Sequence, residues 1–322
     1  MRKNLLKQMA VSTAAALLSM TTLSACSALG QAPTVASEES SLHHQDDENA
    51  STVSGSESSE AAHSDSASGS RLDDILERGY IEVVTEPYFA PNEFIDPSKQ
   101  GDDKYVGADI ELARYIADKL GVECRIVPLE FEAVLTGVSE GKYDLAISAL
   151  AYTPARAEAM EMSKGYYFSE DDAVQYGLMV RDEDLDVIKS AEDLSDKVVV
   201  VQSGSIQEMF ASDQVPAYKE LKRVSATTDG FLAVQEGKAD AVITAKTTAQ
   251  LYLDANEGCG MTVVPDFAFV VDESTQGTRI GMPKGETELC NKVNEIIDEV
   301  IDSGVYAEWY GEYKEYARSL GL

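Results

Sequence analysis

The stretch EGKYDLAISALAYTPARAEAM, residues 140–160, holds a turn, a strand and the start of a helix. The apolar run at 145–150 is typical of a buried strand. Thr153 is a good N-cap residue, and Pro154 suits the first helical turn, where no amide hydrogen is needed. We therefore expect a helix over 154–160 directly after the strand.

The first half of this stretch has a counterpart later in the chain. EGKYDLAISA at 140–149 and EGKADAVITA at 236–245 share Glu, Gly, Lys, Asp, Ile and Ala at matching positions. In each, the Gly ends a helical segment and the Asp leads a buried strand. Chance similarity is one explanation, and a pair of equivalent α/β lobes is the one we favour. Ligands bind beyond the carboxyl ends of strands in such sheets, so we expect a site between facing lobes.

Short apolar runs alternate with segments of helical period through the rest of the chain after residue 70. We expect strands at 81–85, 122–127, 145–150 and 198–201, and helices at 108–120, 131–138, 154–160 and 206–210. Alternation of strand and helix indicates an α/β fold with mostly parallel sheets flanked by helices.

Arg156 falls in the first turn of the helix that begins at Pro154. A cation there is mildly unfavourable, because the helix dipole is positive at this end. A bound anion reverses the sign, since free amides, the dipole and a bidentate guanidinium then converge on one carboxylate. A ligand with a carboxyl group therefore explains Arg156. An ion pair with Glu158 or Glu93 explains it equally well at this point.

A second turn suited to an anion occurs at QSGSIQE, residues 202–208. Gly204 permits close approach of the backbone, and Ser205 with Glu208 forms an S-x-x-E capping box ahead of a helix. The amides of Ser205 and Ile206 could hold the same carboxylate from the other lobe. Capping boxes are common, so the turn is informative only because each expected lobe has one such turn.

The N-terminus has the features of an export signal. A basic start precedes an apolar stretch at about 9–23 and the tetrapeptide LSAC, which ends at Cys26. This order predicts a signal peptide over 1–25. LSAC resembles the lipobox of bacterial lipoproteins, in which the Cys becomes the lipidated first residue, and two acyl chains would anchor it stably. An ordinary secretory signal with a chance Cys is the alternative.

Residues 26–70 are expected to form a disordered acidic tether that carries the lipidated Cys. Positions 27–70 contain 13 Ser and 8 acidic residues, with no Lys, Arg or aromatic residue. Such a segment cannot bury enough apolar surface to offset its ordering entropy. The three histidines of the chain, His43, His44 and His63, all lie here. The folded part therefore offers no Ser-His-Asp, Cys-His or His-ligated metal chemistry, although a metal at His43-His44 stays open.

Charge and cysteine content limit the partners further. The chain has 57 Asp and Glu against 26 Lys and Arg, a net charge of −31, which argues against nucleic acid as a partner. Beyond Cys26 there are Cys124, Cys259 and Cys290. An odd number leaves at least one thiol free, and Cys259–Cys290 is the first pair to consider. We expect no cofactor, no metal and a monomer.

Several segments resemble, in order, the extracellular solute-binding proteins of family 3, the receptors of polar amino-acid ABC importers. They are YVGADIELARYIADKLGV, FEAVLTGVSEGKYDLAISALAYTPARAEAM, LSDKVVVVQSGSIQEMF and NKVNEIIDEVIDSGVYAEWYGEY. The resemblance covers about 72–322 and implies a two-lobed, periplasmic-binding-protein-like Venus-flytrap fold of type II. One lobe would comprise 72–177 plus 276–322, and the other 178–275.

The resemblance implies a membrane-anchored extracytoplasmic receptor. It would bind an amino acid or related small carboxylate in the interlobe cleft and deliver it to ABC permease and ATPase subunits. Arg156 matches the arginine that binds the ligand α-carboxylate, and Ser205 and Ile206 fall where the second lobe supplies backbone amides. Closure of the lobes would then exclude water from the ligand.

The resemblance also implies the walls of the site. Phe131 falls where an aromatic or apolar residue packs on the ligand side chain. The segment TEPYFAPNEF places Phe89 at an aromatic wall and Glu86 at a specificity position, with Tyr88 as the alternative to Phe89.

Two positions depart from the family pattern. Ala151 stands where Ser or Thr is usual, and Ala245 stands where an Asp typically pairs with the ligand ammonium. The missing charged hydrogen bond would be worth roughly 1.5–3 kcal/mol. Three explanations stay open. The ligand ammonium is held by Glu86, or it is held by neutral oxygens, including the Ala149 carbonyl and Thr244. Alternatively, the ligand is not a standard α-amino acid, and a second anionic group of it binds Lys246.

Two other functions stay open. Certain dehydratases resemble these receptors and use a carboxylate as the acid, for which Glu86 or Glu130 could serve. An extracellular ligand sensor is the other alternative. We expect a binding protein and not an enzyme.

Overall fold

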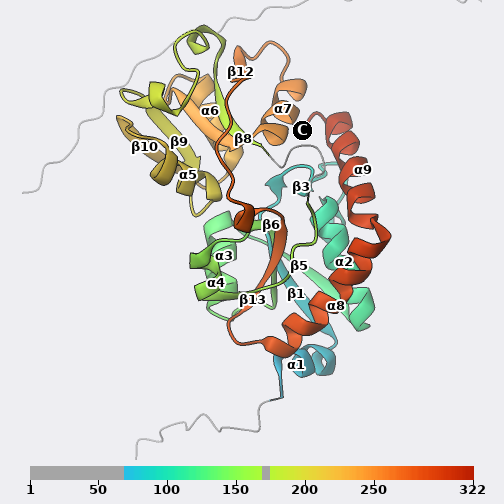
Figure 1. The fold of residues 1–322 in the computed structure, drawn as a ribbon. Coiled ribbons are helices and arrows are strands. Elements are labelled where there is room, and N and C mark those ends of the chain that lie inside the picture. The colour runs from blue at the N-terminus through green and yellow to red at the C-terminus, as the bar shows by residue number, and fades with distance from the viewer. Residues whose placement is uncertain (1–68, 169–174) are drawn as a thin grey trace, which may run out of the picture. The chain divides into compact units, whose positions relative to one another are not determined.

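The computed structural model describes residues 69–168 and 175–322, and Figure 1 shows their fold. The predictions for the signal peptide, for Cys26 and for the three histidines lie outside the described residues. So does the tether, except for its last two residues.

The first lobe is built on a five-stranded sheet with the order β5-β1-β6-β13-β7. Its strands are β1 (Tyr80–Thr85), β5 (Glu123–Pro128), β6 (Leu145–Ala151), β7 (Met160–Met162) and β13 (Thr278–Pro283). Strands β5, β1 and β6 run parallel, and β13 is antiparallel to both of its neighbours. Its helices are α1 (Arg71–Arg78), α2 (Ala108–Leu120), α3 (Phe131–Ser139), α4 (Pro154–Ala159), α8 (Thr287–Ser303) and α9 (Val305–Leu320).

The second lobe is built on a five-stranded sheet of matching design, with the order β10-β9-β11-β8-β12. Its strands are β8 (Tyr176–Arg181), β9 (Val198–Gln202), β10 (Glu220–Val224), β11 (Ala241–Ala245) and β12 (Met261–Val263). Strands β10, β9 and β11 run parallel, and β8 is antiparallel to β11 and β12. Its helices are α5 (Ile206–Gln214), α6 (Thr227–Gln235) and α7 (Lys246–Ala255).

Short elements complete the fold. A three-stranded sheet joins β2 (Tyr88–Phe89), β3 (Glu93–Ile95) and β4 (Tyr105–Val106). Short 3₁₀ helices lie at Gly101–Lys104, Asp182–Asp184, Ala191–Leu194 and Glu273–Thr275. The predicted lobe boundaries, 72–177 with 276–322 and 178–275, stay predictions.

Each five-stranded sheet has helices on both faces (Figure 1). In the first lobe, α2 and α8 bury Ile116 and Ile297 against one face, and α3 buries Val134 against the other. In the second lobe, α5 buries Phe210 on one face and α6 buries Phe231 on the other. This three-layer arrangement confirms the predicted α/β fold with mostly parallel sheets.

The aspartate of the repeated EGK-x-D unit makes the same hydrogen bond to the backbone in both sheets. Asp144 accepts a hydrogen bond at Oδ2 from the Glu82 N–H of β1 at 2.7 Å. Asp240 accepts one at Oδ2 from the Val198 N–H of β9, also at 2.7 Å. Asp144 directly precedes β6, and Asp240 directly precedes β11. Each side chain thereby connects its own strand to the neighbouring parallel strand, β1 or β9. The shared interaction confirms that the sequence echo marks equivalent units.

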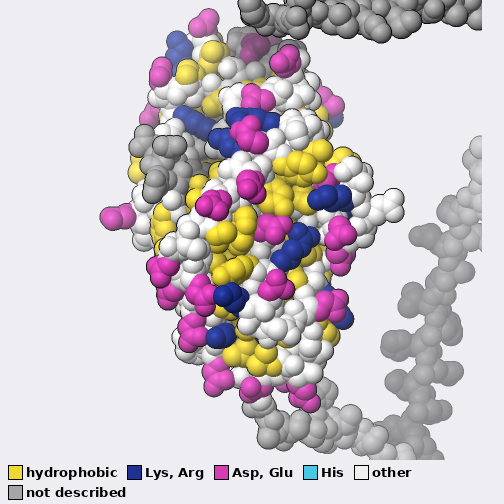
Figure 2. Space-filling view, turned by 90° about the vertical axis from the view of Figure 1, so that its right-hand side faces the viewer, with side chains coloured by type: hydrophobic (Ala, Val, Ile, Leu, Met, Phe, Trp, Pro, Cys, Tyr) yellow, Lys and Arg dark blue, Asp and Glu magenta, His cyan; other side chains and the backbone are white. Residues whose placement is uncertain are grey.

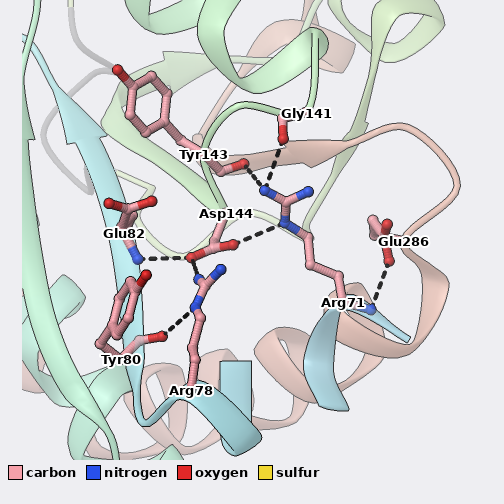
Figure 3. Close-up of polar contacts among 8 residues, drawn as sticks. All are labelled: Arg71, Arg78, Tyr80, Glu82, Gly141, Tyr143, Asp144 and Glu286. Carbon is pink, nitrogen blue, oxygen red and sulfur yellow. Dashed lines mark hydrogen bonds and ion pairs between the residues drawn. The ribbon is translucent and has the colours of Figure 1, made fainter. Parts of the chain in front are cut away.

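Arginines complete both units. In the first lobe, Asp144 pairs with Arg71 Nε at 2.8 Å and with Arg78 (Figure 3). These ion pairs fix α1 to the N-terminal start of β6. Arg71 also donates to the carbonyl oxygens of Gly141 and Tyr143. In the second lobe, Arg181 Nη2 pairs with Asp240 at 3.3 Å.

Two predicted element ends and one cysteine pair need correction. The helix expected over 154–160 ends at Ala159, because Met160 pairs with Pro283 and begins β7. The helix expected over 206–210 continues to Gln214. Cys259 and Cys290 are both free thiols, and Cys290 lies on α8, where its sulfur accepts from Asn294 Nδ2 at 3.4 Å.

The described residues contain no helix that is long and apolar enough to cross a bilayer. On the face that Figure 2 shows, Asp and Glu side chains are spread over the surface, with Lys and Arg side chains among them. Within 69–168 and 175–322, no group of three or more Cys, Asp or Glu side chains is placed to hold a metal ion.

Candidate ligand-binding site

A small cavity lies where strands of both sheets end. Glu86 directly follows β1, Ala151 ends β6, and Gln202 ends β9. Carboxyl ends of parallel strands are where open α/β sheets place ligands.

Eight predicted site residues line this cavity. They are Glu86, Phe89, Phe131, Ala149, Ala151, Arg156, Ser205 and Ile206. Phe89 and not Tyr88 is the aromatic residue of the loop after β1 that reaches it, while Tyr88 is half exposed and lines a separate hollow.

Two predicted site residues, Thr244 and Ala245, do not line the cavity. Both are almost completely buried at the end of β11. Ala245 pairs with Tyr176 of β8, and the larger Tyr176 side chain contributes to the lining. Lys246 does not line it either, because its Nζ points to the Gln175 side chain at 3.3 Å and the Pro265 carbonyl at 3.5 Å. The structure gives no support to Lys246 as an anion-binding residue.

Arg156 is held in the cavity wall by backbone oxygens. Thr153 caps α4 by accepting from the Arg156 N–H at 3.1 Å, as predicted. The guanidinium donates from Nη1 to the Ala151 carbonyl at 2.8 Å and from Nη2 to the Gly204 carbonyl at 3.1 Å. Its Cζ lies 5.4 Å from the centre of the Phe131 ring, which is within cation–π range. The side chain is therefore oriented by its neighbours and bridges the two lobes.

No ion pair neutralises Arg156 within the described part of the chain. Glu158 is exposed on the surface, and Glu93 accepts from Ser148 instead. Burial lowers the pKa of Arg156 to about 10, because little water remains to solvate its charge. Of the two explanations for Arg156, the geometry therefore favours a bound carboxylate over an internal acid.

The turn at 202–208 supplies the second lobe's side of the cavity. Gly204 has a φ of +72°, a conformation that L side chains rarely adopt. Ser205 is the N-cap of α5 and accepts from the Glu208 N–H at 3.2 Å, but the Glu208 carboxylate accepts from Gly204 N–H and not from Ser205. The predicted capping box is thus only half formed. The Ile206 N–H lies in the first turn of α5, which leaves it without a helical acceptor.

Glu86 is a buried acid in the cavity wall. Its side chain is 2% exposed, and among the described residues its Oε1 atom has no hydrogen-bond partner. Burial raises its pKa to about 8; a hydrogen bond with Gln202 opposes the rise, and the negative charge of Asp229 adds to it by a smaller amount. A positively charged group placed beside Glu86 would stabilise the carboxylate and supply the missing partner.

Ser148 connects Glu86 to a second buried acid, Glu93. Ser148 Oγ accepts from the Glu86 N–H at 3.0 Å and donates to Glu93 Oε1 at 2.8 Å. Burial and the negative charge of Asp109 hold the pKa of Glu93 well above its usual range. Glu93 therefore holds its proton more tightly than an ordinary carboxyl group does, and it supports the cavity wall behind Glu86.

Five residues that line the cavity were not predicted from the sequence as binding residues. They are Glu93, Ser148, Tyr176, Gln202 and Gln207. Gln202 ends β9, so the strand-end rule could have found it, whereas Ser148 lies within β6. Tyr176 begins a strand, and nothing in the local sequence marks it. Glu130, the other acid considered for dehydratase chemistry, is exposed and lies outside the lining.

Other contacts join the two lobes beside the cavity. Ser203 Oγ of the second lobe donates to Glu132 Oε2 of α3 at 2.7 Å. Thr248 Oγ1 of α7 lies 3.5 Å from the carbonyl oxygen of Ala90. These contacts, with the bond from Arg156 to Gly204, stabilise the arrangement in which both lobes contribute to one cavity.

Comparisons with known proteins agree with this site. Residues 81–315 match the bacterial extracellular solute-binding proteins, family 3. The arginine-binding extracellular protein ArtP of Bacillus subtilis is 30% identical over 210 residues, which cover 64% of this chain and 76% of that protein.

Solved structures show the same fold. The amino acid ABC transporter substrate-binding protein AbpA from Streptococcus pneumoniae, bound to L-arginine, is 30% identical with a TM-score of 0.67, over 76% of this chain and 98% of that one. The ancestral amino-acid-binding protein AncCDT-1, a precursor of cyclohexadienyl dehydratase, is 28% identical with a TM-score of 0.64, over 76% of this chain and 99% of that one.

The family and these relatives are binding proteins rather than enzymes, so this chain is a binding protein and the dehydratase alternative is set aside. The two equivalent α/β lobes, the cavity at their strand ends and the match over 81–315 lead to one conclusion. The chain belongs to the bacterial extracellular solute-binding proteins of family 3 and has their two-lobed type II fold.

Proposed function

We propose that this protein is a lipid-anchored receptor that binds an amino acid with a cationic side chain and delivers it to an ABC importer. One observation carries the proposal. Among residues 69–168 and 175–322, the buried Arg156 guanidinium has backbone carbonyls but no acid as partners, and it shares a cavity with the buried carboxyl group of Glu86. A ligand with a carboxylate and a separate cation would match both groups.

The carboxylate is assigned to Arg156. Bidentate pairing with a guanidinium is the strongest hydrogen-bonded arrangement that a carboxylate can make with one side chain. A ligand carboxylate would replace or join the carbonyl acceptors of Ala151 and Gly204. The Ile206 N–H at the start of α5 would add a donor from the second lobe.

The cation is assigned to Glu86. Its unpartnered Oε1 and its raised pKa both indicate a carboxyl group that lacks a positive neighbour. We assign to Glu86 the cationic side chain of the ligand, and not the α-ammonium that every amino acid carries. The matched relatives that bind arginine support this class of ligand.

The test is a thermal-shift and calorimetric comparison of four compounds on the purified protein. L-Arginine has both required groups, agmatine lacks the carboxylate, L-glutamate lacks the cationic side chain, and L-histidine has a weaker cation. We expect L-arginine to raise the unfolding temperature most and agmatine to give no shift. Stronger binding of agmatine or of L-glutamate than of L-arginine would reject the proposed ligand class.

Anchoring and delivery are the second part of the proposal. The LSAC tetrapeptide and the Ser-rich segment up to residue 70 support a lipid anchor at Cys26 with a solvated tether. A tethered receptor would search the membrane surface for its permease and ATPase. Preference of the ligand for the closed arrangement would favour closure, because ligand contacts come from both lobes.

A further inference from the structure

Strand β6 bulges where it lines the cavity. Leu150 pairs with Arg279 of β13, but Ala146 pairs with Gly281. Two steps along β13 therefore correspond to four steps along β6, and residues 147–149 leave the regular ladder. Ile280, which lies between these two pairs on β13, makes its backbone hydrogen bonds on the β7 side instead, where its N–H donates to Ser163 Oγ at 2.8 Å. Bulges of this kind re-aim residues next to functional sites.

Ala149 holds the bulge in an unusual conformation. Its φ is +47°, and it is the single non-glycine residue with a positive φ in the described part of the chain. An L residue in this left-handed region is sterically disfavoured and persists only where its surroundings impose it. Ala149 lines the cavity, and two residues later the Ala151 carbonyl accepts from Arg156 Nη1. The backbone at Ala149 therefore sets the position of the oxygen that orients Arg156.

Asp109 is the side chain that bonds to the Ala149 amide. It is completely buried near the start of α2. Its Oδ2 accepts from the Ala149 N–H at 2.7 Å, which is the amide freed from the ladder by the bulge. Its Oδ1 accepts from the hydroxyl groups of Tyr166 at 2.8 Å and Tyr306 at 2.5 Å. Asp109 does not itself line the cavity, but it acts on two residues that do: Ala149, through this hydrogen bond, and Glu93, through its negative charge.

We propose that Asp109 is a positioning residue, which holds Ala149 in the left-handed conformation that the ligand-binding wall requires. The two tyrosines fix the carboxylate from one side, and the carboxylate fixes the Ala149 amide from the other. This inference rests on the proposed function for its link to binding. Its structural part, the dependence of the Ala149 backbone on Asp109, can be tested without any ligand.

The test compares Asp109→Asn with Ala149→Gly and with the double variant. In Asp109→Asn, the single carbonyl oxygen cannot serve both the tyrosines and the Ala149 N–H. We expect the Kd for L-arginine to rise about tenfold or more, since a hydrogen bond to a charged group is lost. We also expect faster hydrogen exchange at the Ala149 amide in the free protein. Unchanged exchange and unchanged affinity would overturn the proposal.

Rescue separates positioning from general stability. Glycine adopts a positive φ freely, so Ala149→Gly should restore part of the affinity in the Asp109→Asn background. Tyr306→Phe is the matched control, because it removes a bond to the same carboxylate but leaves the bond to Ala149. It should lower the unfolding temperature with little change in Kd. An equal loss of affinity in Tyr306→Phe, or a double variant no better than Asp109→Asn, would overturn the proposal.

Two further outcomes are decisive. If the wild-type protein binds none of the four compounds, the proposed ligand class fails, while exchange at the Ala149 amide still decides the role of Asp109. If Asp109→Asn does not fold, the double variant with Ala149→Gly decides. Recovery of the folded state would support the clamp on Ala149, and its failure would contradict it.

Discussion

The Arg156 guanidinium of the first lobe donates to the Gly204 carbonyl of the second lobe at 3.1 Å. The same guanidinium donates to the Ala151 carbonyl at the end of β6. One buried cation therefore bonds to a carbonyl oxygen of each lobe and lines the cavity between them. This relationship explains why a cation occurs at the start of the short helix α4, where the helix dipole alone would disfavour it.

Replacement of Arg156 by Ala should abolish ligand binding without unfolding the protein. Loss of two charge-assisted hydrogen bonds corresponds to a rise in Kd of about a hundredfold or more. Stability should change little, because the variant also removes a buried charge that has no acid partner. Calorimetry with L-arginine and a urea titration would measure the two effects separately. Arg156→Lys is the matched control and should bind weakly, because Lys cannot pair bidentately.

Binding of a cationic ligand should become tighter as the pH rises from 6 to about 8. The carboxyl group of Glu86 has a pKa raised to about 8, so ligand binding must displace its proton in this range. Calorimetry in two buffers of different ionisation enthalpy should detect proton release. Glu86→Gln should remove the pH dependence, whereas Glu130→Gln, at an exposed acid outside the cavity, should leave it intact. Gln202, Glu93 and Asp229 also act on Glu86 and are unchanged in both variants.

Stability of the ligand-free protein should show the opposite trend with pH. The folded-state pKa of Glu86 lies above its ordinary value of 4.5, so the folded protein holds the proton more tightly than the unfolded chain does. The contribution of Glu86 is therefore fully present below about pH 4.5 and is lost as the pH rises through about 8. Between pH 4.5 and about 8, the free energy of unfolding should fall less in Glu86→Gln than in the wild-type protein. Equal pH profiles for wild type and variant would contradict the assignment.

The contact between Ser203 and Glu132 should favour the closed arrangement. Ser203→Ala removes a hydrogen bond of 2.7 Å between the lobes. We expect the Kd to rise about three- to tenfold, in line with the usual worth of one hydrogen bond. Stopped-flow measurements should place the change in the dissociation rate. Ser139→Ala, on the same helix α3 as Glu132 but bonded only to its own Thr136 carbonyl, is the control.

Substitution of Asp144 should destabilise the first lobe more than it affects ligand contacts. Asp144→Asn removes the buried carboxylate that pairs with Arg71 and Arg78. The loss of one partner of such a buried pair lowers the free energy of unfolding by about 3 kcal/mol. Both arginines keep some contact with water, so the value is an upper range for this site. Hydrogen exchange should increase over α1 and the start of β6. Asp240→Asn is the equivalent change in the second lobe and should leave α1 protected.

Much of the fold could be predicted from local sequence. Alternating apolar runs placed strands such as 145–150 within one residue of β6, and the repeated EGK-x-D unit identified the two lobes. Helix starts at Thr153 and Ser205 followed from N-cap chemistry. These features depend on residues close together in the chain, where backbone propensity and burial leave few choices.

The parts of the site that escaped prediction depend on distant contacts. Asp109 bonds to Ala149, forty residues later in the chain, and to Tyr306 near the other end. Tyr176 enters the cavity because an antiparallel strand pairs it with Ala245. Sheet order and register decide such contacts, and no local pattern encodes either one. Thr244 was expected in the site as a neutral oxygen for the ligand ammonium, but its side chain is buried and does not line the cavity.

A crystal structure of the protein with its tightest-binding compound from the four-compound comparison tests the central claim most directly. We predict a ligand carboxylate within hydrogen-bond distance of both terminal nitrogens of Arg156 and of the Ile206 N–H, with the ligand cation beside Glu86. A ligand whose carboxylate lies elsewhere, with Arg156 still bound only to the carbonyls of Ala151 and Gly204, would contradict the account.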